Sequence, residues 1–235
     1  MRVDPRSTHA MNTIPLTRIA TLLAVALCLL STQPTPSRAA DEAIMKQTRQ
    51  ITILAFGDSL TAGYGLPTDQ SLTARLEQLL LTNQYNVRLI NAGVSGDTTT
   101  GGLARLAWTL EQPVDAAILE LGANDALMGQ DPAVVERNLD AMLTMFHTKG
   151  IPVLLAGMRA IANYGEDYAQ AFDAIYPRLA AKHGTLFYPF LLEGVVMDPA
   201  LNQLDGIHPN ERGAREIASR MYPLVRELVE QAYRN

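Results

Sequence analysis

A serine that follows a buried strand is the first residue in the sequence that could do chemistry. Residues 51–56 are apolar and rich in β-branched side chains, which is typical of a buried strand, and the chain then turns at once through Gly57, Asp58 and Ser59. In open α/β sheets, ligands bind in the crevice beyond the carboxyl ends of the strands. Ser59 is therefore a candidate nucleophile, although most serines in such a place only cap a helix or a turn.

Two of the histidines are better explained by structure than by chemistry. His147 and His183 each fall in the last turn of a predicted helix, just before a glycine. The helix dipole favours a side chain that can carry positive charge at that position. We therefore assign both a structural role.

His208 differs because it sits in a polar loop with a carboxylate close by. Pro209 favours an extended conformation at His208, and Asp205 lies three residues upstream. One ring nitrogen could face Asp205 and the other a serine or a substrate, although a surface histidine paired locally with Asp205 is an equally good interpretation of this loop alone. A serine nucleophile needs a base, and that base needs a third group to fix its tautomer. Ser59, Asp205 and His208 together predict such a triad.

Negative charge that develops on a carbonyl oxygen during attack by a serine needs hydrogen-bond donors. The candidates are the backbone N–H groups of Ser59 and Gly93 and the side-chain amide of Asn124, all at predicted strand ends. Each of these signals is weak alone. Their common position at one sheet edge is the argument for an oxyanion hole.

The elements that must position these residues alternate along the chain. The sequence predicts strands over 51–56, 86–92, 116–121, 151–157 and 186–190, and helices over 71–83, 98–111, 131–149, 168–182 and 210–231. Such alternation indicates βαβ units and a parallel sheet with helices on both faces. The carboxyl ends of parallel strands emerge at one edge, so the candidate residues should meet there.

The N-terminal segment reads as a secretory signal peptide over 1–39. Three arginines precede an apolar run of about twelve residues, too short to span a bilayer, and small residues follow at 37–39. A retained membrane anchor is the alternative. We expect cleavage, a disordered lead-in over 40–50, one catalytic domain over 51–232, no membrane span in the mature chain, and a periplasmic or secreted location. The start at Met1 or Met11 stays open.

Composition excludes several classes of function. The single cysteine, Cys28, lies inside the apolar run, so the mature chain would have no thiol chemistry and no disulfides. The leader holds four arginines and one aspartate, so the rest of the chain carries a formal charge of −8 rather than −5. Such an acidic chain is a poor candidate for binding nucleic acid. No spacing of ligands suggests a metal or another cofactor.

Four ordered blocks resemble those of the GDSL or SGNH hydrolase family: GDSL at 57–60, NAG at 91–93, GAND at 122–125 and DGIH at 205–208. The flanking residues are most similar to the periplasmic acyl-CoA thioesterase, lysophospholipase and arylesterase subgroup. The resemblance covers about 51–229 and implies a flavodoxin-like three-layer sandwich around a five-stranded parallel sheet. It implies Ser59 as nucleophile, His208 as base, Asp205 as its partner, and Gly93 and Asn124 in the oxyanion hole. The turn lacks the second glycine of G-x-S-x-G, so no α/β-hydrolase nucleophile elbow is implied.

Apolar residues on loops of the same edge could line an acyl groove, although each one alone is better explained as core. The residues concerned are Leu60, Leu66, Met158, Ile161, Tyr164 and Ile207. We expect residues 158–165 to form a flap over this groove. The predicted reaction is hydrolysis of small-molecule acyl esters and thioesters by a monomer. A short-chain carbohydrate deacetylase and a non-catalytic lipid-binding protein of the periplasm are the alternatives.

Overall fold

The computed structural model of the chain describes residues 48–160 and 162–235, all within one compact unit, Ala43–Asn235. The predicted signal peptide and residues 40–47 of the predicted lead-in lie outside the described residues. Arg49, however, is held in place, because its guanidinium bonds Asp115 Oδ1 at 2.8 Å. The lead-in over 40–50 stays a prediction.

The centre of the fold is a five-stranded parallel sheet, as the alternation of elements predicts. The strand order is β2-β1-β3-β4-β5, with β1 Ile51–Gly57, β2 Val87–Gly93, β3 Ala116–Glu120, β4 Val153–Ala156 and β5 Leu186–Tyr188. The central strands are buried on both faces, which explains their continuous apolar sequences. β2 is an edge strand, and only Val87 and Leu89 in it are buried. The fold class is therefore α/β, as expected.

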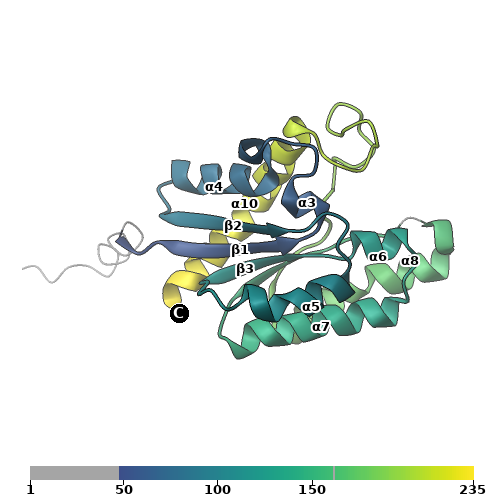
Figure 1. Cartoon of the computed structure of the whole chain (residues 1–235), viewed down its shortest axis with the longest axis horizontal. Coiled ribbons are helices and arrows are strands. Elements are labelled where there is room, and N and C mark those ends of the chain that lie inside the picture. Colours follow the sequence, from purple (N-terminus) through teal and green to yellow (C-terminus); the bar gives the residue numbers. More distant parts are fainter. Residues whose placement is uncertain (1–47, 161) are drawn as a thin grey trace, which may run out of the picture. The chain divides into compact units, whose positions relative to one another are not determined.

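Helices cover both faces of this sheet, in the three-layer arrangement that the resemblance implies (Figure 1). One face carries α4 Leu72–Thr82 and α10 Glu211–Arg234, and the other carries α5 Thr99–Thr109 and α7 Pro132–Thr148. Polar side chains cap these helices as the sequence predicts. Ser71 accepts a hydrogen bond from Ala74 N, and Asn210 accepts from Arg212 N and Gly213 N.

The single helix predicted over 168–182 is wrong. The structure has two helices, α8 Glu166–Asp173 and α9 Ile175–His183, which meet at Ala174. Pro177 lacks the N–H that would bond the carbonyl oxygen of Asp173, and its ring would crowd that carbonyl. The helix therefore breaks and restarts before Pro177.

Within the described residues, no helix is both long enough and apolar enough to span a membrane. The remaining short elements lie close to the sheet edge at which the strands end. They are α3 Ser59–Ala62, η1 Thr68–Gln70, α6 Ala123–Leu127 and η2 Ala162–Tyr164. Both α3 and α6 begin directly after a strand, so the residues that follow β1 and β3 are fixed by helical turns.

Candidate active site

Ser59 is the first residue of α3, directly beyond the end of β1. Asp58 is the cap, because its Oδ1 accepts a hydrogen bond from Leu60 N at 2.9 Å. Ser59 is therefore spared from capping, which was the alternative role for it. Only 9% of Ser59 is exposed, and its N–H has no acceptor among the described residues. The serine offers both a hydroxyl group and a backbone donor at this point.

His208 and Asp205 lie together on the loop before α10. Asp205 Oδ1 accepts hydrogen bonds from the backbone N–H groups of Ile207 at 3.0 Å and His208 at 2.9 Å. Asp205 Oδ2 lies 2.7 Å from His208 Nδ1. The ring of Tyr64 packs against the imidazole with 4.7 Å between ring centroids. Asp205 on this loop and Tyr64, which follows α3, thus fix the imidazole from two sides.

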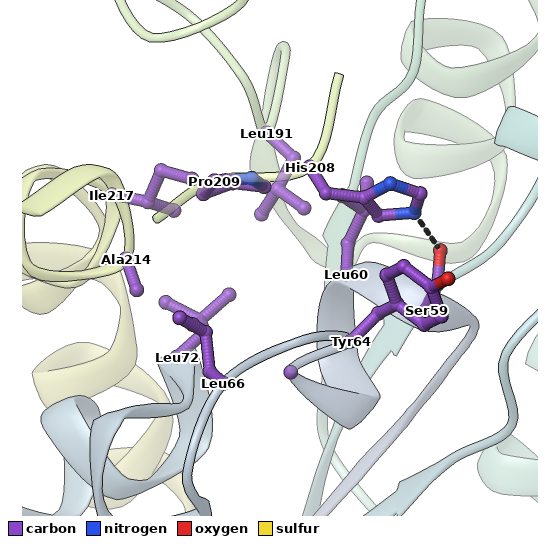
Figure 2. A pocket seen from close by; sticks show the side chains of 11 residues that line it. Ser59, Leu60, Tyr64, Leu66, Leu72, Leu191, His208, Pro209, Ala214 and Ile217 are labelled. Carbon is purple, nitrogen blue, oxygen red and sulfur yellow. Dashed lines mark hydrogen bonds between the residues drawn. The ribbon is translucent and has the colours of Figure 1, made fainter. Parts of the chain in front are cut away.

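The structure brings Ser59 to this pair. Ser59 Oγ lies 2.9 Å from His208 Nε2 (Figure 2). With the Nδ1 proton directed at Asp205, Nε2 can accept the hydroxyl proton of Ser59. Burial acts to raise the pKa of Asp205, but hydrogen bonds from the backbone and ring of His208 and from Ile207 N outweigh it and lower this pKa to about 2. Asp205 therefore stays ionised at neutral pH and favours a positive charge on the imidazole.

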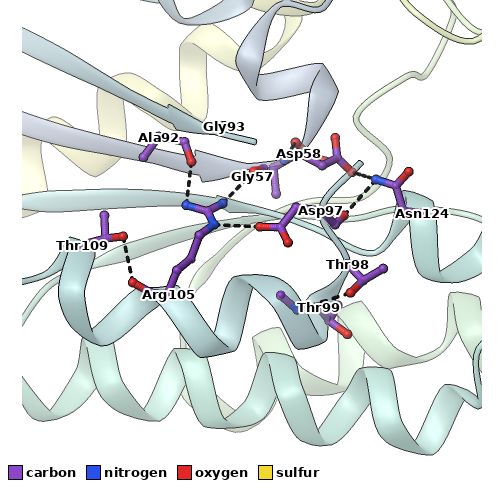
Figure 3. Close-up of polar contacts among 12 residues, drawn as sticks. Gly57, Asp58, Ala92, Gly93, Asp97, Thr98, Thr99, Arg105, Thr109 and Asn124 are labelled. Carbon is purple, nitrogen blue, oxygen red and sulfur yellow. Dashed lines mark hydrogen bonds and ion pairs between the residues drawn. The ribbon is translucent and has the colours of Figure 1, made fainter. Parts of the chain in front are cut away.

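Asn124 lies on α6 and faces the residue before the serine. Its Nδ2 donates to the carbonyl oxygen of Asp97 at 2.8 Å and to Asp58 Oδ2 at 3.2 Å (Figure 3). Both amide hydrogens thus have acceptors, and the bond to Asp58 is the longer one. A developing oxyanion could take over that hydrogen with little movement of Asn124.

The structure does not support Gly93 as an oxyanion donor. Its N–H already donates to Asn91 Oδ1 at 3.0 Å, and a Cβ atom on Gly93 would lie 2.2 Å from Ala62 N. The glycine is needed for close approach of β2 to α3. Gly96, in the turn before α5, has a φ of +82° and open space around it. No acceptor for its N–H occurs in the part of the chain that the structure describes, so Gly96 replaces Gly93 as the candidate.

A pair of buried carboxyl groups lies under the serine. Asp58 and Glu120 are 0% and 1% exposed. Glu120 Oε2 accepts hydrogen bonds from Thr61 Oγ1 at 2.7 Å and from Asp58 N at 3.2 Å, so it holds both ends of the turn that carries Ser59. Burial raises the pKa of Asp58 to about 6, and burial together with the Asp58 carboxylate raises the pKa of Glu120 well above its ordinary value.

The buried pair of Asp58 and Glu120 should make the free energy of unfolding depend on pH. Both carboxyl groups hold their protons to a higher pH in the folded chain than in the unfolded chain, so the free energy of unfolding should fall as the pH rises from about 4 to about 6. Glu120→Gln keeps an oxygen for Thr61 and Asp58 and removes one ionisable group. We expect a flatter pH dependence, measured by urea unfolding across this range.

The control for this experiment is Glu136→Gln. Glu136 is bound to Arg178 on the surface, and that hydrogen bond lowers its pKa. Loss of this carboxylate should not flatten the fall in stability. A Glu120→Gln curve parallel to that of the wild type would contradict the proposed protonation of the pair.

The apolar residues predicted to line a groove are only partly brought together. Leu60 and Leu66 line a cavity of about 10 Å³ beside Ser59 and His208 (Figure 2), which is room for one water molecule rather than for an acyl chain. Ile207 is 37% exposed beside His208. Met158 is only 2% exposed and belongs to the core, so its predicted place in a groove is wrong.

The predicted flap is described only in part. Ile161 lies outside the described residues. Tyr164 is 51% exposed, and its hydroxyl donates to the carbonyl oxygen of Leu127 at 3.1 Å. Tyr164 therefore joins the segment after β4 to the end of α6, but it does not line the cavity beside Ser59.

His147 and His183 lie where the sequence places them, at the ends of α7 and α9. His183 Nε2 is 2.6 Å from Asp140 Oδ1. Gly96 and Glu120 were not predicted as residues of the site. A charged residue near the end of the apolar strand predicted over 116–121 was the signal for Glu120. The sequence SGD at 95–97 was the turn signal for Gly96.

The parallel sheet, with a serine, a histidine and an aspartate in hydrogen-bonding contact at its edge, has the arrangement of a serine hydrolase. The model of the GDSL-like Lipase/Acylhydrolase family matches residues 55–216. The chain therefore belongs to the GDSL-like lipase/acylhydrolase family.

Individual proteins agree with this assignment. The chain is 38% identical over 187 residues to Esterase TesA of Pseudomonas aeruginosa, covering 79% of this chain and 93% of the relative. It is 39% identical over 179 residues to Thioesterase 1/protease 1/lysophospholipase L1 of Escherichia coli K12, covering 76% and 85%. Among solved structures it is similar to AlinE4, described as an SGNH-hydrolase family esterase, with 47% identity, a TM-score of 0.65 and coverage of 76% and 96%.

Proposed function

We propose that the chain is a serine esterase that hydrolyses acyl esters and thioesters through an acyl-enzyme on Ser59. The observation that carries this proposal is the chain of contacts from Ser59 Oγ to His208 Nε2 at 2.9 Å and from His208 Nδ1 to Asp205 Oδ2 at 2.7 Å. Family membership and relatives named as esterase and thioesterase support the same reaction.

In the first half of the reaction, His208 Nε2 takes the Ser59 proton as Oγ bonds to the substrate carbonyl carbon. The charge on the carbonyl oxygen is stabilised by Ser59 N–H, Asn124 Nδ2 and, in place of Gly93, Gly96 N–H. Collapse of the tetrahedral intermediate breaks the bond to the alcohol or thiol, which leaves with the proton from His208. Water, deprotonated by His208, then releases the acid and restores Ser59. Asp205 stabilises the imidazolium ion in both halves.

We place this reaction outside the cytoplasm, on small-molecule substrates and in a monomer. The arginines and the apolar run within residues 1–39 support export. An acyl chain would lie over exposed apolar side chains near the site, of which Tyr64 and Ile207 flank His208. Every proton transfer in this scheme is supplied by the chain's own side chains.

The decisive experiment is hydrolysis of a p-nitrophenyl ester series from acetyl to palmitoyl, with Ser59→Ala as the control. We expect activity across the series that depends on Ser59. In the same assay, Tyr164→Ser should reduce turnover of the long-chain esters more than that of the acetyl ester, because Tyr164 holds the segment after β4 against α6.

Other outcomes of this assay are equally informative. If Ser59→Ala hydrolyses the esters at the wild-type rate, the assignment of Ser59 as the nucleophile is wrong. If Tyr164→Ser lowers turnover of short and long esters equally, the predicted flap over the groove is wrong. Activity confined to acetyl esters would favour the carbohydrate deacetylase, and no hydrolysis at all would favour the lipid-binding alternative.

A further inference from the structure

Arg105 reaches three separate segments at the sheet edge from its place on α5. Its Nε donates to Asp97 Oδ2 at 2.7 Å, its Nη1 to the carbonyl oxygen of Ala92 at 2.9 Å, and its Nη2 to that of Gly57 at 2.9 Å (Figure 3). One guanidinium group therefore joins the end of β1, the end of β2 and the turn that precedes α5.

Two of these three contacts, those to Gly57 and Asp97, lie close in sequence to groups of the proposed oxyanion hole. Gly57 precedes Asp58 and Ser59, so the Gly57 carbonyl fixes the start of the turn that carries the nucleophile. Asp97 follows Gly96, and its carbonyl oxygen accepts the Asn124 amide at 2.8 Å. The Gly57 carbonyl and the Asp58 N–H share one planar peptide group, so Arg105 fixes the peptide before the one that carries the Ser59 N–H. It also holds the side chain of Asp97, one residue after Gly96.

The surroundings of Arg105 suit a guanidinium group rather than a simple charge. Its Cζ lies 3.8 Å from the centroid of the Phe56 ring, so the ring supports the planar group. Gly101 leaves room for the partner, because a Cβ atom there would lie 2.0 Å from Asp97 Oδ1. A lysine ammonium on a flexible stem cannot match this fork of donors.

The contacts of Arg105 differ from those of an ordinary surface ion pair in burial and in the type of acceptor. The side chains of Arg105 and Asp97 are 22% and 11% exposed, and two of the three acceptors are backbone carbonyls at strand ends, where the sheet ladder stops. Arg105 thus bridges the ends of β1 and β2 and the turn that carries Gly96.

We propose that Arg105 is a positioning residue for the oxyanion hole, which it keeps aligned by tying together the Gly57, Ala92 and Asp97 segments. This inference rests on the proposed esterase function. Donors that are already aligned need no reorganisation as the oxyanion forms, so Arg105 should act on the chemical step rather than on substrate binding.

The test compares Arg105→Met and Arg105→Lys with the wild type on a p-nitrophenyl ester. Loss of one oxyanion donor costs about 10²–10³ in kcat, so misalignment in Arg105→Met should lower kcat by about 10- to 100-fold with KM little changed. Arg105→Lys keeps the charge and should recover little of this loss. Ethylguanidinium added to Arg105→Ala should restore part of kcat, and ethylammonium should not.

The matched control is Arg75→Met. Arg75 lies on α4, is also partly buried, at 17% side-chain exposure, and pairs at 3.0 Å with Glu211 of α10, which Arg215 also holds. Its loss should leave kcat unchanged even where thermal unfolding shows lower stability. This separates a loss of alignment from a general loss of stability.

Binding of an alkyl trifluoromethyl ketone gives a second readout. Ser59 Oγ adds to its carbonyl carbon, and the resulting oxyanion occupies the hole, so its affinity should fall in Arg105→Met by the same factor as kcat. The corresponding alcohol, which cannot form the adduct, should bind equally to both proteins.

Three results would overturn the inference: wild-type kcat in Arg105→Met, full recovery in Arg105→Lys, or equal weakening of ketone and alcohol binding. Each of them leaves Ser59-dependent hydrolysis by the wild type intact. Failure of the esterase proposal itself would instead show as hydrolysis that survives Ser59→Ala. If Arg105→Met does not fold, the comparison of Arg105→Lys with the wild type decides.

Discussion

Alanine in place of His208 is expected to lower kcat for an acyl ester by about 10⁵- to 10⁶-fold, as much as Ser59→Ala does. Without the imidazole, the hydroxyl group of Ser59, which lies 2.9 Å from Nε2, has no base to take its proton. The Ser59→Ala/His208→Ala double variant should be no slower than either single variant, because the two residues act as one unit. Steady-state kinetics on a p-nitrophenyl ester measure all three.

Two further variants test the same unit: Asp205→Asn should cause a smaller loss, and His183→Ala should cause none. Asparagine at 205 can still accept from Ile207 N and His208 N, but its amide presents hydrogens to Nδ1, so the wrong tautomer is favoured and a loss of about 10⁴-fold is expected. His183 forms an equally close pair with Asp140, at 2.6 Å, just before β5 begins and so at the sheet edge opposite the site. Its replacement should leave kcat unchanged. Additive losses in the double variant would contradict a shared unit of Ser59 and His208.

Gly96→Ala is expected to lower kcat by up to about 10²-fold while the chain still folds. The space around Gly96 is open, so an alanine meets no clash, but a φ of +82° strains it by about 1–2 kcal/mol and turns the peptide group away from its present direction. Kinetics and thermal unfolding on the same preparation separate the two effects.

Two other glycines provide controls for this experiment. Gly150 has a φ of +69° and open space at the end of α7, so Gly150→Ala should carry the same strain without loss of activity. Gly93→Ala should instead fail to fold, because its Cβ would lie 2.2 Å from Ala62 N and 2.7 Å from Ala62 Cα. If Gly96→Ala folds and keeps the wild-type kcat, the role proposed for Gly96 as an oxyanion donor is wrong.

The sequence was sufficient to predict the sheet and the meeting of Ser59 with His208. Strands that alternate with helices must run parallel, and parallel strands deliver their following loops to one edge, so residues far apart in the chain meet there. Caps at Ser71 and Asn210 were equally predictable, because a cap depends only on neighbouring backbone groups. The break between α8 and α9 was also marked in the sequence, by Pro177.

The remaining site residues depend on contacts that no local pattern contains. Glu120 looked like one charged residue in an apolar strand, and only the fold places its carboxyl group under Thr61. Arg105 looked like an ordinary helix residue among leucines. Gly93 was chosen because it follows a predicted strand, whereas the hydrogen bond from its N–H to Asn91 is visible only in three dimensions.

The loop before α10 joins Asp205 and His208 within four residues, because Asp205 binds both the backbone and the ring of His208. Among the described residues, one hydrogen bond, across 149 positions of sequence, connects this preassembled pair to Ser59. Displacement of the loop would therefore change the reach of the imidazole without changing which nitrogen is protonated. The tautomer of His208 is thus set within the loop, whereas its distance from Ser59 depends on the position of the loop.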